Sequence, residues 1–93
     1  MERTDRIRVH NASDREVIFM LEPWGQTCPM PAGATFEVVA RGPEGDWLEV
    51  AFEQGYVTVY GWPGSLVTVY DGSRIVADGD HPPPPTPPRL TTL

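Results

Sequence analysis

Lysine is absent from this chain of 93 residues, and all seven of its basic side chains are arginines. Thirteen aspartates and glutamates outnumber them, which gives a formal net charge of −6 at pH 7. Nucleic-acid binders present a basic face that neutralises phosphate charge. The composition therefore predicts that the chain does not bind nucleic acid. A basic set made only of arginine is also typical of GC-rich genomes, which favours a bacterial or phage source.

Cysteine is almost absent as well. Cys28 is the only one, so no disulfide can form within the chain, and the class of disulfide-stapled secreted domains is excluded. A lone thiol is most often a small apolar filler in a core. The alternative is a reactive thiol or one that pairs between chains.

Long apolar runs are missing too. No stretch of about 18 apolar residues exists, so we expect no membrane span. The first residues, MERTDRIRVHN, are polar and charged, unlike the apolar segment of a signal peptide. We therefore expect a cytoplasmic protein that does not contact a membrane. The alternative is a protein exported by a route that does not use such a signal.

A repeated strand-like sequence dominates what is present. Val-Thr-Val-Tyr occurs at 57–60 and again at 67–70, separated by Gly-Trp-Pro-Gly-Ser at 61–65. Valine, threonine and tyrosine in strict alternation are typical of a half-buried β-strand. The short connection between the two copies predicts a β-hairpin over 56–72. In such a hairpin one face would be shared by Thr58, Tyr60, Thr68 and Tyr70, with Trp62 at the tip. We favour a second core layer for these aromatic side chains. The alternative is a binding surface in which Trp62 is exposed.

Other short alternating segments complete an all-β prediction of about seven strands. The further strands are expected at residues 7–9, 16–21, 35–41, 47–52 and 74–77. Helical periodicity is absent, so no crossover helix is available for a parallel strand pair. The pattern predicts a small antiparallel β-sandwich, with a small barrel as the alternative. Segment 16–21 is apolar on both faces, which is typical of a central or covered strand.

The segment from Glu22 to Gly33 is predicted to be irregular. Prolines at 23, 29 and 31 oppose a strand ladder there. It nevertheless carries Trp24, for which two interpretations compete. The ring caps an open end of the β-structure, or the segment is an exposed binding loop. We favour the cap, because a small domain needs the buried area that a tryptophan supplies.

Composition changes after residue 79, which divides the chain into a β-sandwich domain at 1–79 and a proline-rich tail at 80–93. Six prolines lie between 82 and 88, which favours an extended polyproline II or disordered tail. Residues 84–89 have the form PxxPxR and resemble ligands of SH3 domains. We predict an arm that docks on a partner or a neighbouring subunit through Pro84, Pro87, Arg89 and Leu90. A plain flexible terminus is the alternative.

Catalytic and metal-binding patterns are missing. The only histidines are His10 and His81, and spacing supplies neither with a catalytic partner. No Gly-x-Ser-x-Gly sequence is present. One cysteine and two histidines cannot form a Cys₄ or Cys₂His₂ zinc site. We therefore expect no enzymatic activity, no metal and no cofactor.

One short segment resembles a known family. Residues 31–36, PAGATF, have the form Pro-x-Gly-x-x-Phe and resemble part of the cupredoxins. A blue-copper centre requires two histidines and a cysteine, usually with an axial methionine close by. Cys28 precedes this segment and no histidine follows it nearby. The resemblance therefore concerns the fold and implies no copper.

Binding is the function class that remains. We predict a non-enzymatic protein-binding or assembly module, with a protein partner or a homo-oligomer. The alternative is a β-sandwich that binds carbohydrate or another small ligand through exposed aromatic side chains. The candidate binding residues in the domain are Trp24, Trp62, Tyr60 and Tyr70.

Overall fold

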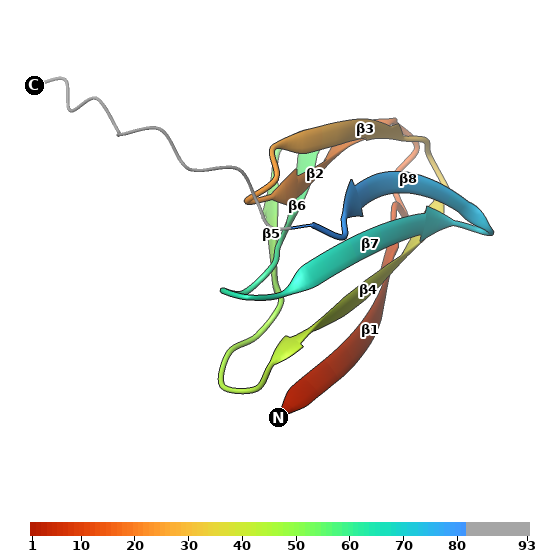
Figure 1. Ribbon diagram of the computed structural model, residues 1–93. Helices are drawn as coiled ribbons and strands as arrows, with labels where there is room; N and C mark the ends of the chain where they lie inside the picture. The colour runs from red at the N-terminus through yellow and green to blue at the C-terminus, as the bar shows by residue number, and fades with distance from the viewer. Residues whose placement is uncertain (82–93) are drawn as a thin grey trace, which may run out of the picture.

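The computed structural model describes residues 1–81, which form eight β-strands and no helix. Two four-stranded sheets face each other and are not closed into a barrel (Figure 1). The predicted all-β architecture is confirmed, with eight strands instead of about seven. Within these residues, no helix is long and apolar enough to cross a membrane. The strands are β1 (Glu2–His10), β2 (Val17–Glu22), β3 (Gln26–Met30), β4 (Thr35–Pro43), β5 (Glu49–Glu53), β6 (Tyr56–Tyr60), β7 (Leu66–Asp71) and β8 (Arg74–Gly79).

The first sheet has the strand order β1-β4-β7-β8, and every neighbouring pair is antiparallel. Successive side chains of a strand point to opposite faces of the sheet, so every second residue points toward the other sheet. The prediction that Phe36, Val38 and Ala40 point inward is confirmed, because all three are fully buried.

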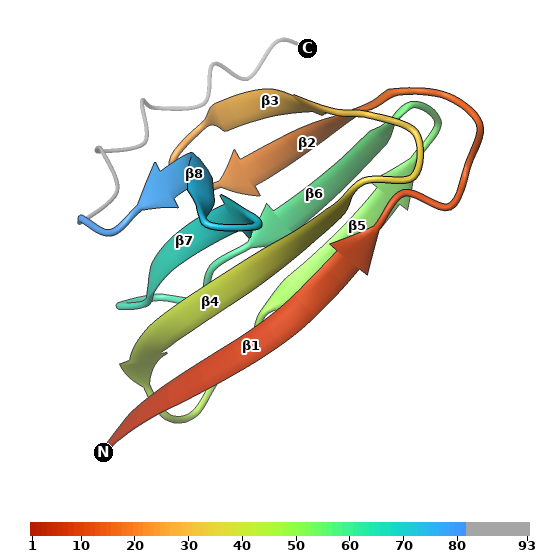
Figure 2. The ribbon, with the colours of Figure 1, turned by 90° about the vertical axis from the view of Figure 1, so that its right-hand side faces the viewer.

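The second sheet has the order β3-β2-β6-β5, and here the antiparallel prediction is wrong for one pair. β2 and β6 run parallel, with Phe19 opposite Val57 and Leu21 opposite Val59. Parallel neighbours need a long connection. In this chain the connection contains β3, β4 and β5, so it passes through the other sheet and needs no helix (Figure 2).

The predicted hairpin over 56–72 is also wrong. β6 belongs to the second sheet and β7 to the first, so residues 61–65 cross from one sheet to the other. Both copies of Val-Thr-Val-Tyr still behave as half-buried strands. Val57 and Val59 enter the core from one side, and Val67 and Val69 enter it from the other. Each copy of the repeat has one apolar face. Two such strands can pair as a hairpin in one sheet or lie in two facing sheets, so the repeat is compatible with both arrangements.

Aromatic and aliphatic side chains from both sheets fill the core. The rings of Phe19 and Phe36 meet edge to face, with centroids 5.3 Å apart and planes inclined by 68°. This geometry is favourable for two aromatic quadrupoles. The other buried members are Val9, Leu21, Trp24, Met30, Val38, Ala40, Val57, Val59, Trp62, Val67, Val69 and Ala77.

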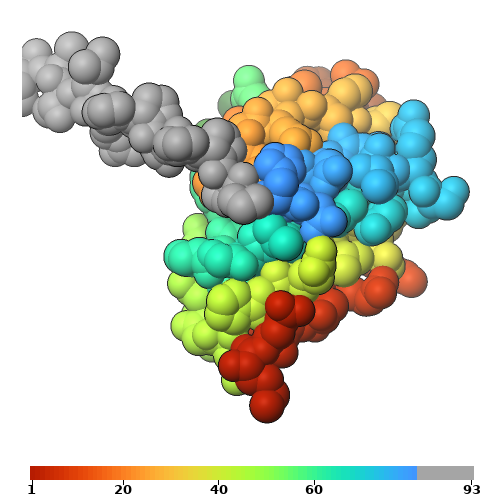
Figure 3. Space-filling view, viewed as in Figure 1, coloured from red at the N-terminus to blue at the C-terminus, as the bar shows by residue number. Residues whose placement is uncertain are grey.

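β3 is a strand that the sequence did not predict. It lies at the edge of its sheet, with a neighbouring strand on one side only. Proline is tolerated in an edge strand because the open side has no strand that needs its N–H. The two sheets approach each other where β3 lies beside β8 (Figure 3). There the side-chain amide of Gln26 accepts a hydrogen bond from the Asp78 N–H at 2.7 Å and donates one to the Asp78 carbonyl at 2.5 Å. The Gln26 side chain on β3 thus bonds the Asp78 backbone on β8 as a neighbouring strand would, and it links the two sheets.

Trp24 is buried at the same end, in agreement with the favoured interpretation as a cap. Its ring packs against Gly61 and Gly79, and a Cβ at Gly79 would lie 2.6 Å from the Trp24 Cδ2 atom. The indole N–H donates to the carbonyl of His81 at 2.8 Å. This bond fixes the end of the described chain beside the seam between β3 and β8.

Candidate functional site

The outer face of the β3-β2-β6-β5 sheet carries a regular grid of side chains. Strand register places Tyr60 between Glu22 and Glu49 in one row, Thr58 between Met20 and Ala51 in the next, and Tyr56 between Ile18 and Glu53 in the third. We call this surface the tyrosine face. Its members are Ile18, Met20, Glu22, Glu49, Ala51, Glu53, Tyr56, Thr58 and Tyr60.

The apolar floor of the tyrosine face comes from β2. This strand is internal to the sheet, so Phe19 and Leu21 are buried in the core while Ile18 and Met20 point to the other side. No second layer covers Ile18 and Met20 within residues 1–81, and both stay half-buried among their neighbours. A strand that is apolar on both faces thus leaves one apolar side open to a partner.

Two tyrosines rise from β6 above this floor. The exposed fractions of Tyr56 and Tyr60 are 46% and 40%, while Thr58 between them is buried. Four residues of extended strand separate the tyrosines by about 13 Å. A depression of about 370 Å³ lies here, lined by Met20, Glu22, Glu53, Tyr56, Thr58 and Tyr60. The surface is therefore a shallow trough with an aromatic ring toward each end.

Carboxylates surround both rings. Glu22 and Glu49 flank Tyr60 across the strands, and Glu53 lies opposite Tyr56. None of the three glutamates forms an ion pair with an arginine of the described residues. Five of the six arginines among residues 1–81 pair with other acids, and Arg8 forms no ion pair there. The tyrosine face therefore concentrates unpaired negative charge around two aromatic rings. A cation can stack on such a ring while a carboxylate neutralises it.

An apolar pocket adjoins the tyrosine face at the mouth of the sandwich. It measures about 240 Å³ and shares Glu53 and Tyr56 with the trough. Phe52 forms part of its lining and is 76% exposed, although its cross-strand neighbour Val57 points into the core. The remaining lining residues are Val9, His10, Asn11, Ala12, Ser13, Val17, Met30 and Val57.

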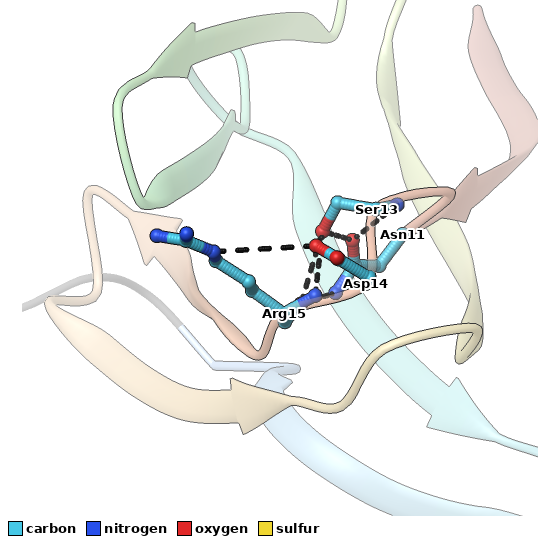
Figure 4. A network of polar contacts seen from close by, with 4 residues as sticks. All are labelled: Asn11, Ser13, Asp14 and Arg15. Carbon is cyan, nitrogen blue, oxygen red and sulfur yellow. Dashed lines mark hydrogen bonds and ion pairs between the residues drawn. The ribbon is translucent and has the colours of Figure 1, made fainter.

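A buried asparagine holds the loop at this mouth (Figure 4). The Asn11 Nδ2 atom lies 2.7 Å from the carbonyl of Arg15 and 3.1 Å from the carbonyls of Met30 and Pro31. Its Oδ1 atom accepts hydrogen bonds from the N–H and the hydroxyl of Ser13. The side chain thus satisfies buried backbone groups, and this explains a polar residue in the wall of an apolar pocket.

Trp62 lies elsewhere and is buried, as the favoured interpretation predicted, and the alternative in which it is exposed is wrong. Only 4% of its surface is accessible. Its indole N–H donates to the Pro43 carbonyl at 2.7 Å, and the Arg3 guanidinium carbon lies 4.6 Å from its ring centroid. The ring fills the end of the sandwich because residues 61–65 cross between the sheets there.

Tyr70 lies on the opposite outer face, so the shared face predicted for Tyr60 and Tyr70 is wrong. Tyr70 lies opposite Glu37 on β4. Glu37 itself forms an ion pair with Arg6 at 3.1 Å. The charges around Tyr70 are therefore balanced, in contrast to those around Tyr60.

The other sequence candidates divide into two groups. Trp24 is buried as described above, while Pro84, Pro87, Arg89 and Leu90 lie outside the described residues. Glu49, Glu53 and Tyr56 were not among the candidates. The signal that could have identified them is the second apolar face of segment 16–21. Such a face is covered either by another layer of the fold or by a binding partner.

Cys28 is half-buried on the core side of β3. Burial raises the pKa of its thiol above the ordinary value, and the positive charge of Arg74 opposes that rise. Among residues 1–81, no three histidine, cysteine or acidic side chains gather into a group that could hold a metal ion. The chain matched no protein-family model, no curated protein and no solved structure.

Proposed function

We propose that this chain is a non-enzymatic protein-binding module, and that the tyrosine face binds a cationic, extended segment of its partner. The observation that carries the proposal is the placement of Tyr60 between Glu22 and Glu49, none of which has a cationic partner in the described part of the chain. Extended segments rich in proline bind to grooves lined by aromatic rings. Arginine adds a planar cation that stacks on an aromatic ring and pairs with carboxylates.

A labelled peptide of repeated Pro-Arg tests this proposal on the full chain. Replacing Tyr60 by alanine removes one ring from the trough. We expect the variant to bind the peptide about tenfold more weakly, because it loses a cation stacked on that ring. Fluorescence anisotropy measures the dissociation constant. Tyr70→Ala is the matched control, because Tyr70 ends the second copy of the same repeat on the opposite face.

The charge of the partner is tested with a Pro-Glu peptide and with salt. We expect the Pro-Glu peptide not to bind, because the carboxylates of the tyrosine face repel it. Binding of the Pro-Arg peptide should weaken as ionic strength rises, since the screening length falls to about 3 Å at 1 M salt. Equal binding of both peptides, or equal losses in Tyr60→Ala and Tyr70→Ala, would refute the proposal.

A second candidate function is carbohydrate binding. Exposed aromatic rings flanked by carboxylates also suit a sugar ring, which stacks on the aromatic face and donates its hydroxyls to the acids. Tyr56 and Tyr60 now carry this hypothesis, because Trp24 and Trp62 are buried. Neutral oligosaccharides would bind with little salt dependence, which separates this function from the first.

A further inference from the structure

We propose that the tyrosine face is occupied by residues 82–93 of a second copy of this chain, with Arg89 between Glu22 and Glu49. This inference rests on the proposed function and names the partner. The chain would then associate with itself through exchanged arms, each arm lying on the other copy.

The composition of the arm matches the chemistry of the tyrosine face. Arg89 is the only arginine outside the described residues, and the three glutamates of the tyrosine face are unpaired among residues 1–81. Six prolines precede Arg89, and proline rings pack well on tyrosine rings. The arm therefore supplies both a cation and the apolar rings that the trough accepts.

The lengths also agree. In a polyproline II conformation, Pro84 and Arg89 are separated by about 16 Å. The two tyrosines of the tyrosine face are separated by about 13 Å along β6. An arm with Arg89 beside Tyr60 therefore places its prolines over Thr58 and Tyr56.

The position of the arm's root favours a second copy over the same copy. His81 is fixed at the seam between β3 and β8 by the indole N–H of Trp24. The side chains of Arg41 and Asp80 form an ion pair at the same place. The tyrosine face is the outer face of its sheet, whereas the His81 carbonyl binds the indole of Trp24, which packs in the core between the sheets. An arm that docked on its own domain would therefore need to turn back around the edge of that sheet.

Four consecutive prolines follow His81 and oppose such a reversal. Extended, the eight residues from His81 to Arg89 span about 25 Å. Glu22 lies only two positions before Trp24, near the root of the arm. In that extended conformation Arg89 would lie far from the Glu22 of its own chain, so we expect it to reach the Glu22 of a neighbour.

The test uses complementary charge reversals in the full chain. Arg89→Glu places an acidic arm against the acidic face, and we expect its dimer dissociation constant to rise at least about tenfold over the unaltered chain. Glu49→Arg should weaken self-association in the same direction. A mixture of the two variants should regain association, because the acidic arm of one fits the basic face of the other. Light scattering behind size exclusion, over a concentration series, measures each case.

Glu44→Arg is the matched control. Glu44 lies exposed in the turn between β4 and β5, where its N–H donates to the Met1 carbonyl, and it is not a member of the tyrosine face. Its reversal changes the net charge by the same amount as Glu49→Arg. We expect it to associate as the unaltered chain does. Circular dichroism checks that every variant keeps its strands.

Two results would overturn the exchanged-arm inference without contradicting the proposed function. If the unaltered chain stays monomeric across the series but binds the Pro-Arg peptide through Tyr60, the face binds another partner. If Arg89→Glu alters the NMR signals of the tyrosine face at every concentration without changing the mass, the arm docks on its own chain. A chain that neither associates nor binds the peptide contradicts both proposals.

Discussion

Tyr60 and Tyr70 end two copies of the same four-residue sequence, yet their surroundings differ. Glu22 and Glu49 flank Tyr60 without cationic partners in the described chain, whereas the glutamate opposite Tyr70 pairs with Arg6. The sequence predicted that each tyrosine points away from the valines of its own copy, and this is confirmed. It could not show which acids lie beside each ring, because those neighbours come from other strands through register.

Asn11 is the residue whose loss should most disturb the mouth of the sandwich. Replacing it by alanine removes the side-chain donor of the buried Met30 carbonyl and of the Arg15 carbonyl, while the Pro31 carbonyl still accepts from the Ala34 N–H. We expect Asn11→Ala to lower the free energy of unfolding by about 2 kcal/mol, the usual cost of unsatisfied buried polar groups. Denaturant unfolding measures it.

Ser13→Ala is the control for this loss. The Ser13 hydroxyl bonds the Asn11 side chain but is exposed, so water replaces it at smaller cost. Equal destabilisation by the two substitutions would contradict the assigned role of Asn11.

Cys28 should react slowly with alkylating reagents near neutral pH. The thiolate is the reactive form, and burial raises the pKa of this thiol above its ordinary value of 9.0. The alkylation rate should therefore still be rising as pH passes that value, and it should level off only at higher pH. Arg74→Ala removes the opposing positive charge, so the pKa should rise further and the rate at pH 9 should fall.

Iodoacetamide labelling followed by mass spectrometry gives this pH profile. Arg15→Ala, in the loop between β1 and β2, is the control and should leave the profile unchanged. A rate that levels off below pH 8 would show that the thiol is activated instead.

At the scale of elements, the strands were easier to predict than their partners. Alternation in 35–41 and in both Val-Thr-Val-Tyr copies fixes a strand and its buried face, since one face must leave water. The same alternation fits a hairpin and a crossing between sheets equally well. The loop at 61–65 therefore looked like a turn, although Trp62 in it needed a buried place.

β3 escaped prediction for a related reason. Pro29 opposes a strand only where its missing N–H is needed, and an edge strand has one free side. Whether a strand lies at an edge depends on the whole sheet, so local sequence could not decide it. The edge position also frees Gln26 to bond β8.

Gln26 should therefore control how firmly the two sheets are joined. Its replacement by alanine removes both hydrogen bonds to the Asp78 backbone. We expect a loss of about 1–2 kcal/mol in unfolding free energy and faster hydrogen exchange at the Asp78 amide. Thr27→Ala, one position along the same strand on its outer side, should leave the exchange of that amide unchanged.

At the scale of the whole molecule, charge is unevenly placed. Arg3 and Arg6 on β1 and Arg41 on β4 form ion pairs. The three glutamates of the tyrosine face, on the other sheet, have no cationic partner among residues 1–81. Isolated pairs of exposed charges contribute little to stability. Their uneven placement bears instead on the association that we propose, because complementary charges orient and select a partner.

The sequence predicted a binding module but not its surface. It directed attention to tryptophans, two of which are buried, since a small sandwich needs their area. The remaining one, Trp47, is 79% exposed just before β5. The tyrosine face could be recognised only when register brought three strands together.

The most direct test of the tyrosine face is an NMR titration of the labelled full chain with the Pro-Arg peptide. We predict that the largest amide shift changes occur in β2, β5 and β6, centred on Thr58 and Tyr60. Changes confined to the β1-β4-β7-β8 sheet, or no changes at saturating peptide, would contradict the assignment of the tyrosine face as the binding surface.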